Sequence, residues 1–167
     1  ITTTEQLEIE LGPAAKGSIW KLPSEKILAR STSQDINENL VEERGRVLER
    51  ALAAHGVETR LVGMVVGPTV TRYELELGEG VKVSRVTSLN KDIAYAMASA
   101  DVRILAPIPG RQAIGIEVPN NERQVVALGD VLSSVEAKRA THPLDVAVGR
   151  DINGKSIVMN LSKMPHI

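Results

Sequence analysis

Basic side chains are the groups in this sequence whose chemistry is most evident. Guanidinium and ammonium groups bind phosphate oxygens, and such contacts position a nucleic-acid duplex on a protein. The alternative is a solvated face, on which these cations form surface ion pairs with Glu74, Glu76 and Glu79. Six basic residues stand at expected strand ends and turns: Arg72, Lys82, Arg85, Lys91, Arg103 and Arg111. The predicted DNA-binding residues among them are Arg72, Arg85, Lys91 and Arg103.

Glycine-containing turns are the second candidate for phosphate chemistry, and they occur at residues 78–80, 109–110 and 153–155. A phosphate-binding loop spaces its glycines so that successive backbone amides surround the phosphates while a lysine reaches the terminal one. Residues 154–156, Gly-Lys-Ser, have the order of the last part of that motif only, since we place the first glycine, Gly149, one position away from the required spacing. Asn-Gly between two alternating runs is, however, the strongest local hairpin signal. We interpret the stretch as a hairpin turn of type I′, in which both central residues have positive φ.

Other catalytic groups are scarce. The chain has no cysteine, so it offers neither a disulfide nor a thiolate metal site. Its three histidines, His55, His142 and His166, are far apart in the sequence and suggest no ligand cluster. No serine lies in a nucleophile elbow. We therefore assign no catalytic, cofactor-binding or metal-binding residue, and we expect no enzyme activity from this chain alone.

The composition predicts a compact domain with an aliphatic core. Hydrophobic residues make up 43% of the 167 residues, but aromatic residues only 2%. The 20 basic and 21 acidic residues give a formal charge of -1, so we expect any DNA contact to be local rather than spread over a broad basic face. No apolar run approaches the roughly 20 residues that cross a bilayer. We expect this part of the protein to be soluble and to make no membrane contact.

Periodicity predicts two helices. Residues 1–31 lack sustained periodicity and are expected to be a linker with one docking point, at Ile19, Trp20 and Leu22. A helix follows over about residues 33–56, capped by Thr32 or Ser33 and stopped by a glycine. A second helix begins near residue 88, and its apolar arc leaves Tyr95 exposed.

Alternation predicts strands at about residues 59–66, 69–77, 102–108 and 113–118. In the second of these, one face is apolar and the other is charged. Residues 125–134 are expected to contain a short helix, residues 135–143 a charged loop, and residues 144–161 a hairpin.

Together these elements predict an α+β fold: two amphipathic helices packed on a mixed sheet of about four strands, followed by a β-hairpin. The break in composition at about residues 135–143 is the expected domain boundary. The predicted division is therefore a linker at 1–31, a domain at 32–134 and the start of a second domain at 143–167.

Three long blocks, residues 67–98, 102–132 and 143–166, together with WKLPS at 20–24, resemble the motor region of FtsK/SpoIIIE DNA translocases. The resemblance covers almost the whole chain. It implies that residues 32–134 correspond to the α domain of the motor and residues 143–167 to the initial strands of its RecA-like ATPase domain.

The resemblance also implies a hexameric ring that moves double-stranded DNA with ATP and Mg²⁺, in chromosome segregation and cell division. Such proteins are usually anchored in the bacterial inner membrane, with the motor on its cytoplasmic face. In the family, the segment LSKMPH leads into the ATP-binding loop. Here the sequence ends at Ile167, so the resemblance assigns a nucleotide-hydrolysing role to no residue of this chain.

Three functional hypotheses follow. The leading one is a non-catalytic part of a DNA translocase motor that acts as ring scaffold and subunit interface. The second is a stand-alone adaptor module that binds a partner protein through a sheet edge. The third, a small-molecule enzyme domain, has only the polar turns in its favour.

Overall fold

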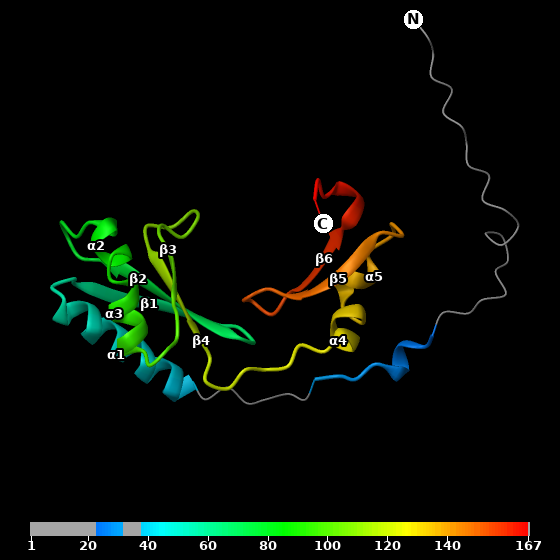
Figure 1. Cartoon of the computed structure of the whole chain (residues 1–167), viewed down its shortest axis with the longest axis horizontal. Helices are drawn as coiled ribbons and strands as arrows, with labels where there is room; N and C mark the ends of the chain where they lie inside the picture. Colours follow the sequence, from blue (N-terminus) through cyan, green and yellow to red (C-terminus); the bar gives the residue numbers. More distant parts are fainter. Residues whose placement is uncertain (1–22, 32–37, 167) are drawn as a thin grey trace, which may run out of the picture.

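The computed structural model describes residues 23–31 and 38–166. The predicted docking point at Ile19, Trp20 and Leu22 and the predicted cap at Thr32 or Ser33 lie outside these residues. The described elements form two groups (Figure 1). The first, the sheet unit, contains α1–α3 and β1–β4; the second, the hairpin unit, contains α4, α5, β5 and β6.

Helix α1 (Glu38–Ala54) forms because apolar residues recur on one face, where Leu48 and Leu52 are fully buried. The helix ends where Gly56 takes a left-handed conformation, with φ +68°. The Val57 amide then bonds to the carbonyl of Leu52 at 3.0 Å, which satisfies one of the last helical carbonyls. The predicted stop is therefore confirmed.

The sheet contains β1 (Thr59–Val66), β2 (Val70–Leu77), β3 (Arg103–Leu105) and β4 (Ile114–Pro119), in the order β1-β2-β4-β3. The α+β class is confirmed, but every pairing is antiparallel, whereas a mixed sheet was expected. Strands β2 and β3 do run parallel to each other, as their helical connection suggests. They are not neighbours, however, because β4 lies between them.

Helices α1, α2 (Val83–Thr87) and α3 (Asn90–Ala96) supply the residues that pack on one face of this sheet (Figure 1). The core is aliphatic as predicted, apart from Tyr73, which is among its largest fully buried side chains. Tyr95 is 89% exposed, also as predicted. A Cβ on Gly45 would lie 2.7 Å from Cδ2 of Leu61, so the glycine allows α1 to approach β1 closely.

In the hairpin unit, α4 (Leu128–Leu132) packs on β5 (Asp145–Arg150), and α5 (Val135–Lys138) packs on β6 (Ser156–Asn160). The short helix and the hairpin were predicted. Helix α5 was expected to be loop; it begins after Ser134, whose hydroxyl accepts from the amide of Ala137. Although α4 falls within the predicted 32–134 domain, it packs on β5; the domain division itself stays a prediction.

Short 3₁₀ helices occur at Glu25–Ile27 (η2) and Leu161–Lys163 (η3). Just after η2, the backbone amide of Ser31 donates to the Asp130 carboxylate at 2.8 Å, and its hydroxyl donates to the same oxygen. The segment 23–31 therefore docks on the hairpin unit through α4. Across the described ranges, no helix combines the length and apolar character needed to span a bilayer.

The predicted type I′ turn is wrong. Of its two central residues, only Gly154 has a positive φ, +78°. The Asp151 amide instead bonds to the carbonyl of Lys155 at 2.9 Å, which closes a loop of three residues. A left-handed glycine at the last loop position is typical of such three-residue connections.

Candidate functional site

The four predicted DNA-binding residues lie on two sides of the sheet unit. Tyr73 points into the helix-covered core, so its neighbour Arg72 must point to the other, open face of the sheet. Arg72 on β2 and Arg103 on β3 are both in register with Glu117 on β4. Arg85 and Lys91 belong instead to the helices of the other side: Arg85 lies on α2 and Lys91 on α3. The four residues therefore form no single basic patch, and DNA binding by them stays a prediction.

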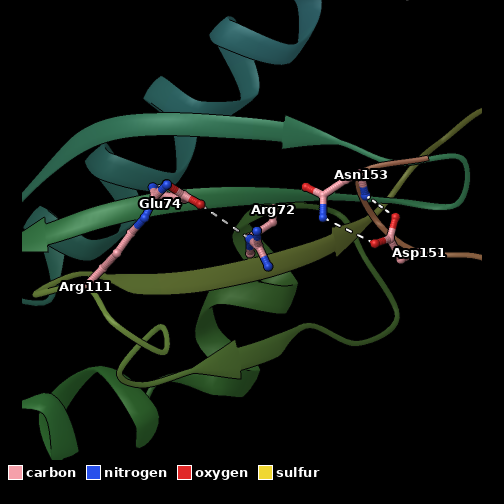
Figure 2. A network of polar contacts seen from close by, with 5 residues as sticks. All are labelled: Arg72, Glu74, Arg111, Asp151 and Asn153. Atoms are coloured by element: carbon pink, nitrogen blue, oxygen red, sulfur yellow. Dashed lines mark hydrogen bonds and ion pairs between the residues drawn. The ribbon is translucent and has the colours of Figure 1, made fainter. Parts of the chain in front are cut away.

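Arg72 is engaged within the protein. Its Nε lies 3.5 Å from Oε1 of Glu74, and the two side chains are only 18% and 6% exposed. Arg111 donates to the other oxygen of the same carboxylate, and Figure 2 shows Glu74 with the two arginines. The Arg72 Nε is buried and makes no hydrogen bond. Glu74 thus joins strand β2 to the loop that carries Arg111. Two of the six basic residues singled out in the sequence, Arg72 and Arg111, therefore have a structural role.

Arg103, Lys91 and Arg85 are exposed, whereas Arg72 is largely buried. The Arg103 side chain is 75% exposed, and its Nη1 lies 3.7 Å from Oε2 of Glu117. Lys91 is also exposed. The Glu117 side chain is only 14% exposed, but at 3.7 Å the two charged groups are beyond hydrogen-bond distance, so the N–H groups of Arg103 stay available to a phosphate.

Arg85 lines a groove at the end of α1. Its Nη2 donates to the carbonyl of His55 at 3.3 Å, which satisfies a backbone group at the helix terminus. The groove has a volume of about 920 Å³ and also carries Lys82, Glu58 and Glu79. Two carboxylates offset the two cations, so the groove has no net positive charge to favour a phosphate. The sequence did not reveal it because α2 was not predicted as a helix.

The spacing of a phosphate-binding loop is present in full at residues 149–156, where the sequence reads GRDINGKS. The sequence analysis placed Gly149 one position away from the required spacing, and that count is wrong, because four residues separate Gly149 from Gly154. In the structure this stretch ends β5, turns and begins β6, with Arg150 paired to Ser156. A phosphate loop leads from a strand into a helix. The stretch therefore has the spacing of the motif without its fold, and the predicted hairpin is confirmed.

The Asp151 carboxylate accepts hydrogen bonds from the backbone amides that would have to bind a phosphate in this turn. Its Oδ1 accepts from the backbone amides of Asn153 at 2.9 Å and Lys155 at 2.8 Å. The bond from the Lys155 amide is the main cause that holds the pKa of Asp151 below its ordinary value. An anion is thus already bound within the turn. Across residues 23–31 and 38–166, no three His, Asp or Glu side chains gather as possible metal ligands.

Sequence reasoning missed a dense polar arrangement at the β1–β2 turn. All three turn carbonyls accept hydrogen bonds from the segment that follows β4. Asn120 donates its side-chain amide to Gly67 at 2.8 Å and its backbone amide to Thr69 at 2.9 Å. The backbone amide of Gln124 donates to Pro68 at 2.8 Å. The turn and the chain that leaves the sheet unit are therefore held together.

Comparison with known proteins finds a matching family model and relatives that share one printed name. The family model described as FtsK alpha domain matches residues 22–120. A DNA translocase FtsK from Streptomyces avermitilis is 55% identical over 111 residues, which are 66% of this chain and 12% of that protein. The Mycobacterium tuberculosis protein of the same name is 55% identical over 111 residues, 66% of this chain and 13% of that protein. The one from Sporosarcina ureae is 41% identical over 159 residues, 94% of this chain and 20% of that protein. The chain therefore spans a fifth or less of the length of these relatives.

Proposed function

The chain belongs to the FtsK alpha domain family, and from this premise we propose that it is the non-catalytic N-terminal part of an ATP-dependent double-stranded DNA translocase motor. The printed names of its relatives, DNA translocase FtsK, support a role in DNA translocation. The other parts of the same protein supply the ATP-binding loop and the Mg²⁺ site. This chain serves as scaffold and subunit interface.

One observation carries the scaffold role. The only stretch of this sequence with phosphate-loop spacing is a hairpin whose amides bind the Asp151 carboxylate. The sheet unit offers a packed core and internal ion pairs in place of a catalytic constellation. A rigid body of this kind suits a part that a neighbouring nucleotide-hydrolysing domain moves.

The assembled protein, in this proposal, is a hexameric ring around double-stranded DNA that acts in chromosome segregation and cell division. Its motor lies at the cytoplasmic face of the bacterial inner membrane, to which other parts of the protein anchor it. The resemblance of residues 20–166 to the family supports this assembly. Arg103 and Lys91 are the stronger candidates for DNA contact, because Arg72 is largely buried against Glu74 and Arg85 lies in a groove without net positive charge.

Calorimetry with ATP and Mg²⁺ tests the scaffold role. The 167-residue chain should release no binding heat, and micromolar affinity for ATP would contradict the proposal. Light scattering on the same sample tests whether this part alone forms the ring. A measured molar mass equal to that of one chain would mean that the contacts between subunits that close the ring lie in other parts of the protein.

Fluorescence anisotropy with labelled duplex DNA tests the contacts of Arg103 and Lys91. Wild-type affinity should fall steeply with salt, because each neutralised phosphate releases counterions. Replacing both residues with alanine should reduce the slope of log K against log salt by about 2. The matched control is Arg46→Ala, an exposed arginine on α1 whose partner is Glu42. If wild type shows no affinity even at low salt, these residues do not contact DNA.

The adaptor hypothesis has one observation in its favour: β1 is an edge strand of eight residues. Two features oppose pairing with a partner strand there. The register of β1 shifts between Leu61 and Gly63, and Arg60 is charged and exposed. Bulges and charged residues are common devices that protect sheet edges. The translocase proposal is therefore preferred.

A further inference from the structure

The segment that precedes the sheet unit in the sequence contacts α4 of the hairpin unit at close range. A Cβ on Gly129 would lie 2.6 Å from the carbonyl oxygen of Ala29 and 3.2 Å from Cβ of Leu28. Gly129 is buried, although α4 has only five residues. Figure 1 shows segment 23–31, in blue, passing next to α4. The 3₁₀ helix η2 also packs on α4, so the contact extends along the segment.

Space, rather than backbone conformation, requires a glycine at position 129. Gly129 lies within α4 and is not among the described glycines with positive φ. Alanine is favoured over glycine inside a helix, so α4 by itself would be more stable with alanine here. The added Cβ would, however, overlap a backbone oxygen of the segment, which would then have to move. The docked segment therefore explains the glycine.

Asp130, the next residue, accepts both polar hydrogens of Ser31. The Ser31 amide donates to Oδ2 of Asp130 at 2.8 Å, and the Ser31 hydroxyl donates to the same oxygen. These hydrogen bonds are the main cause that lowers the pKa of Asp130, and the positive charges of Arg150 on β5 and Arg30 on the segment lower it further. Hydrogen bonds to an ionised carboxylate are stronger than those between neutral groups. Charge and space therefore select the same position of the segment.

The helix that receives the segment is part of the hairpin unit. Helix α4 packs on β5, and its Val131 is only 2% exposed. The Ser133 hydroxyl donates to the carbonyl of Gly129 within the same helical stretch. Among residues 23–31 and 38–166, the hydrogen bonds that leave segment 23–31 end on Asp130. The segment is therefore attached to the hairpin unit, although the sheet unit follows it in the sequence.

The order of these parts along the chain gives the contact its consequence. Ser31 and Asp130 are 99 positions apart, and the whole sheet unit lies between them in the sequence. The chain thus leaves α4 after Ser31, forms the sheet unit and returns to α4 at Leu128. A pull on the chain before residue 23 reaches α4 before it reaches the sheet unit. While the segment is docked, the sheet unit lies outside the path of that tension.

We propose that α4 is the docking site of segment 28–31, and that tension on the upstream chain enters through the hairpin unit while the sheet unit stays free to reorient. The ligand of this site is an extended stretch of the same chain, with the Ala29 carbonyl over Gly129 and Ser31 over Asp130. The docking goes beyond the proposed function. Its use, to hold the ATPase side of the motor against an anchor, rests on that function.

Amide hydrogen exchange on the 167-residue chain tests the docking. The Ser31 amide, which donates to Asp130, should exchange about tenfold more slowly in wild type than in Gly129→Ala, because the added Cβ displaces the Ala29 carbonyl. Alanine favours the helix, so a loss of protection cannot come from a weaker α4. The matched control is Gly149→Ala, since a Cβ there meets nothing within 4 Å. This control should match wild type.

A second variant removes the acceptor instead of the space. Asp130→Ala should also raise the exchange rate of the Ser31 amide by about tenfold, while unchanged protection of the β2 and β5 amides shows that both variants are folded. Ser31 exchange at the wild-type rate in both variants would overturn the docking. The wild-type rate should not depend on protein concentration. Slower exchange at higher concentration would show that the segment docks on another copy, and would overturn attachment within one chain.

Stretching of single molecules in optical tweezers tests the path of tension. Because the chain has no cysteine, DNA handles attach only at introduced ones, here Glu25→Cys on the segment and Lys163→Cys after β6. In this doubly labelled chain, a short reversible extension should precede unfolding of the sheet unit, as the segment leaves α4. Adding Gly129→Ala should remove that first extension. Its persistence in Gly129→Ala, with the same length and force, would overturn the role of α4 in the path.

The docking and the proposed function fail separately. A full-length wild-type protein that hydrolyses ATP without translocating DNA would contradict the proposed function. Ser31 exchange and the first extension are measured without ATP, so they would still report on the docking. Fast Ser31 exchange in wild type would overturn the docking and leave the translocase proposal as it stands.

Discussion

Arg111 and Glu74 form an ion pair that ties the loop before β4 to strand β2 across the open face of the sheet. The Glu74 carboxylate is almost fully buried and also faces Arg72. In the same region Ile108 covers Gly115, where an added Cβ would lie 3.3 Å from Cγ1 of the isoleucine. Part of the open face is thus an ordered structural surface.

Glu74→Gln should destabilise the fold by about 1–3 kcal/mol, because Arg72 and Arg111 lose the charge of their shared partner. Urea denaturation measures the change. Glu76→Gln is the matched control, because the ion pair between Glu76 and Arg60 is exposed. This substitution should lower the free energy of unfolding by no more than about 0.5 kcal/mol. Equal effects of the two substitutions would show that the Glu74 pairs are no stronger than surface ones.

Gly45→Leu should destabilise the fold by about 1–3 kcal/mol, because the larger side chain must displace Leu61 or lift α1 from the sheet. Ala54→Leu, at an exposed position of the same helix, is the control and should change stability by less than about 0.5 kcal/mol. Thermal or urea unfolding distinguishes the two. A neutral Gly45→Leu would mean that α1 does not approach β1 as closely as described.

Lys155→Ala should leave the ATP hydrolysis of the full-length protein within about twofold of wild type, because Lys155 belongs to a hairpin turn. A lysine of a true phosphate-binding loop contacts the transferred phosphoryl group, and its loss would lower the rate by orders of magnitude. Steady-state phosphate release decides between the two outcomes. A large loss would reinstate residues 149–156 as a nucleotide site.

Acidification should release the segment 23–31 from α4. The hydroxyl and amide of Ser31 hold the pKa of Asp130 below its ordinary value. Because the pKa of Asp130 is lower in the folded than in the unfolded protein, the stabilisation by this contact is fully present above the unfolded-state pKa of about 3.9. It is lost as the pH falls through the lower folded-state pKa. The Ser31 amide shift in NMR should titrate with a midpoint below 3.9. Asp130→Asn should abolish that titration; an unchanged curve would exclude the contact as its cause.

Local patterns predicted much of the fold. The strand expected at 59–66 matches β1, because alternation records which side chains face the core. The stop of α1 at Gly56 and the final hairpin follow from equally local signals. The antiparallel pairing could not be predicted in the same way. It depends on β4 entering between β2 and β3, a contact between segments distant in sequence.

The functional residues were harder to predict for the same reason. Arg72 was chosen for its charge, but its burial depends on Glu74 and on the close approach of its side chain to Gly115 of another strand. Gly67 and Asn120 carry no periodic signal, since their partners lie more than fifty positions away. The phosphate-loop spacing at 149–156 shows the reverse case. There the motif is complete in sequence, and the fold around it decides that it is a turn.

DNA translocation by the full-length protein tests the central claim most directly. A third strand bound to a duplex gives a direct signal, since a motor that tracks along the duplex displaces it. The wild-type protein should displace the third strand only when ATP and Mg²⁺ are present, and only from a duplex long enough for the motor to load. Active ATP hydrolysis without displacement would contradict the assignment of this chain to a DNA translocase motor.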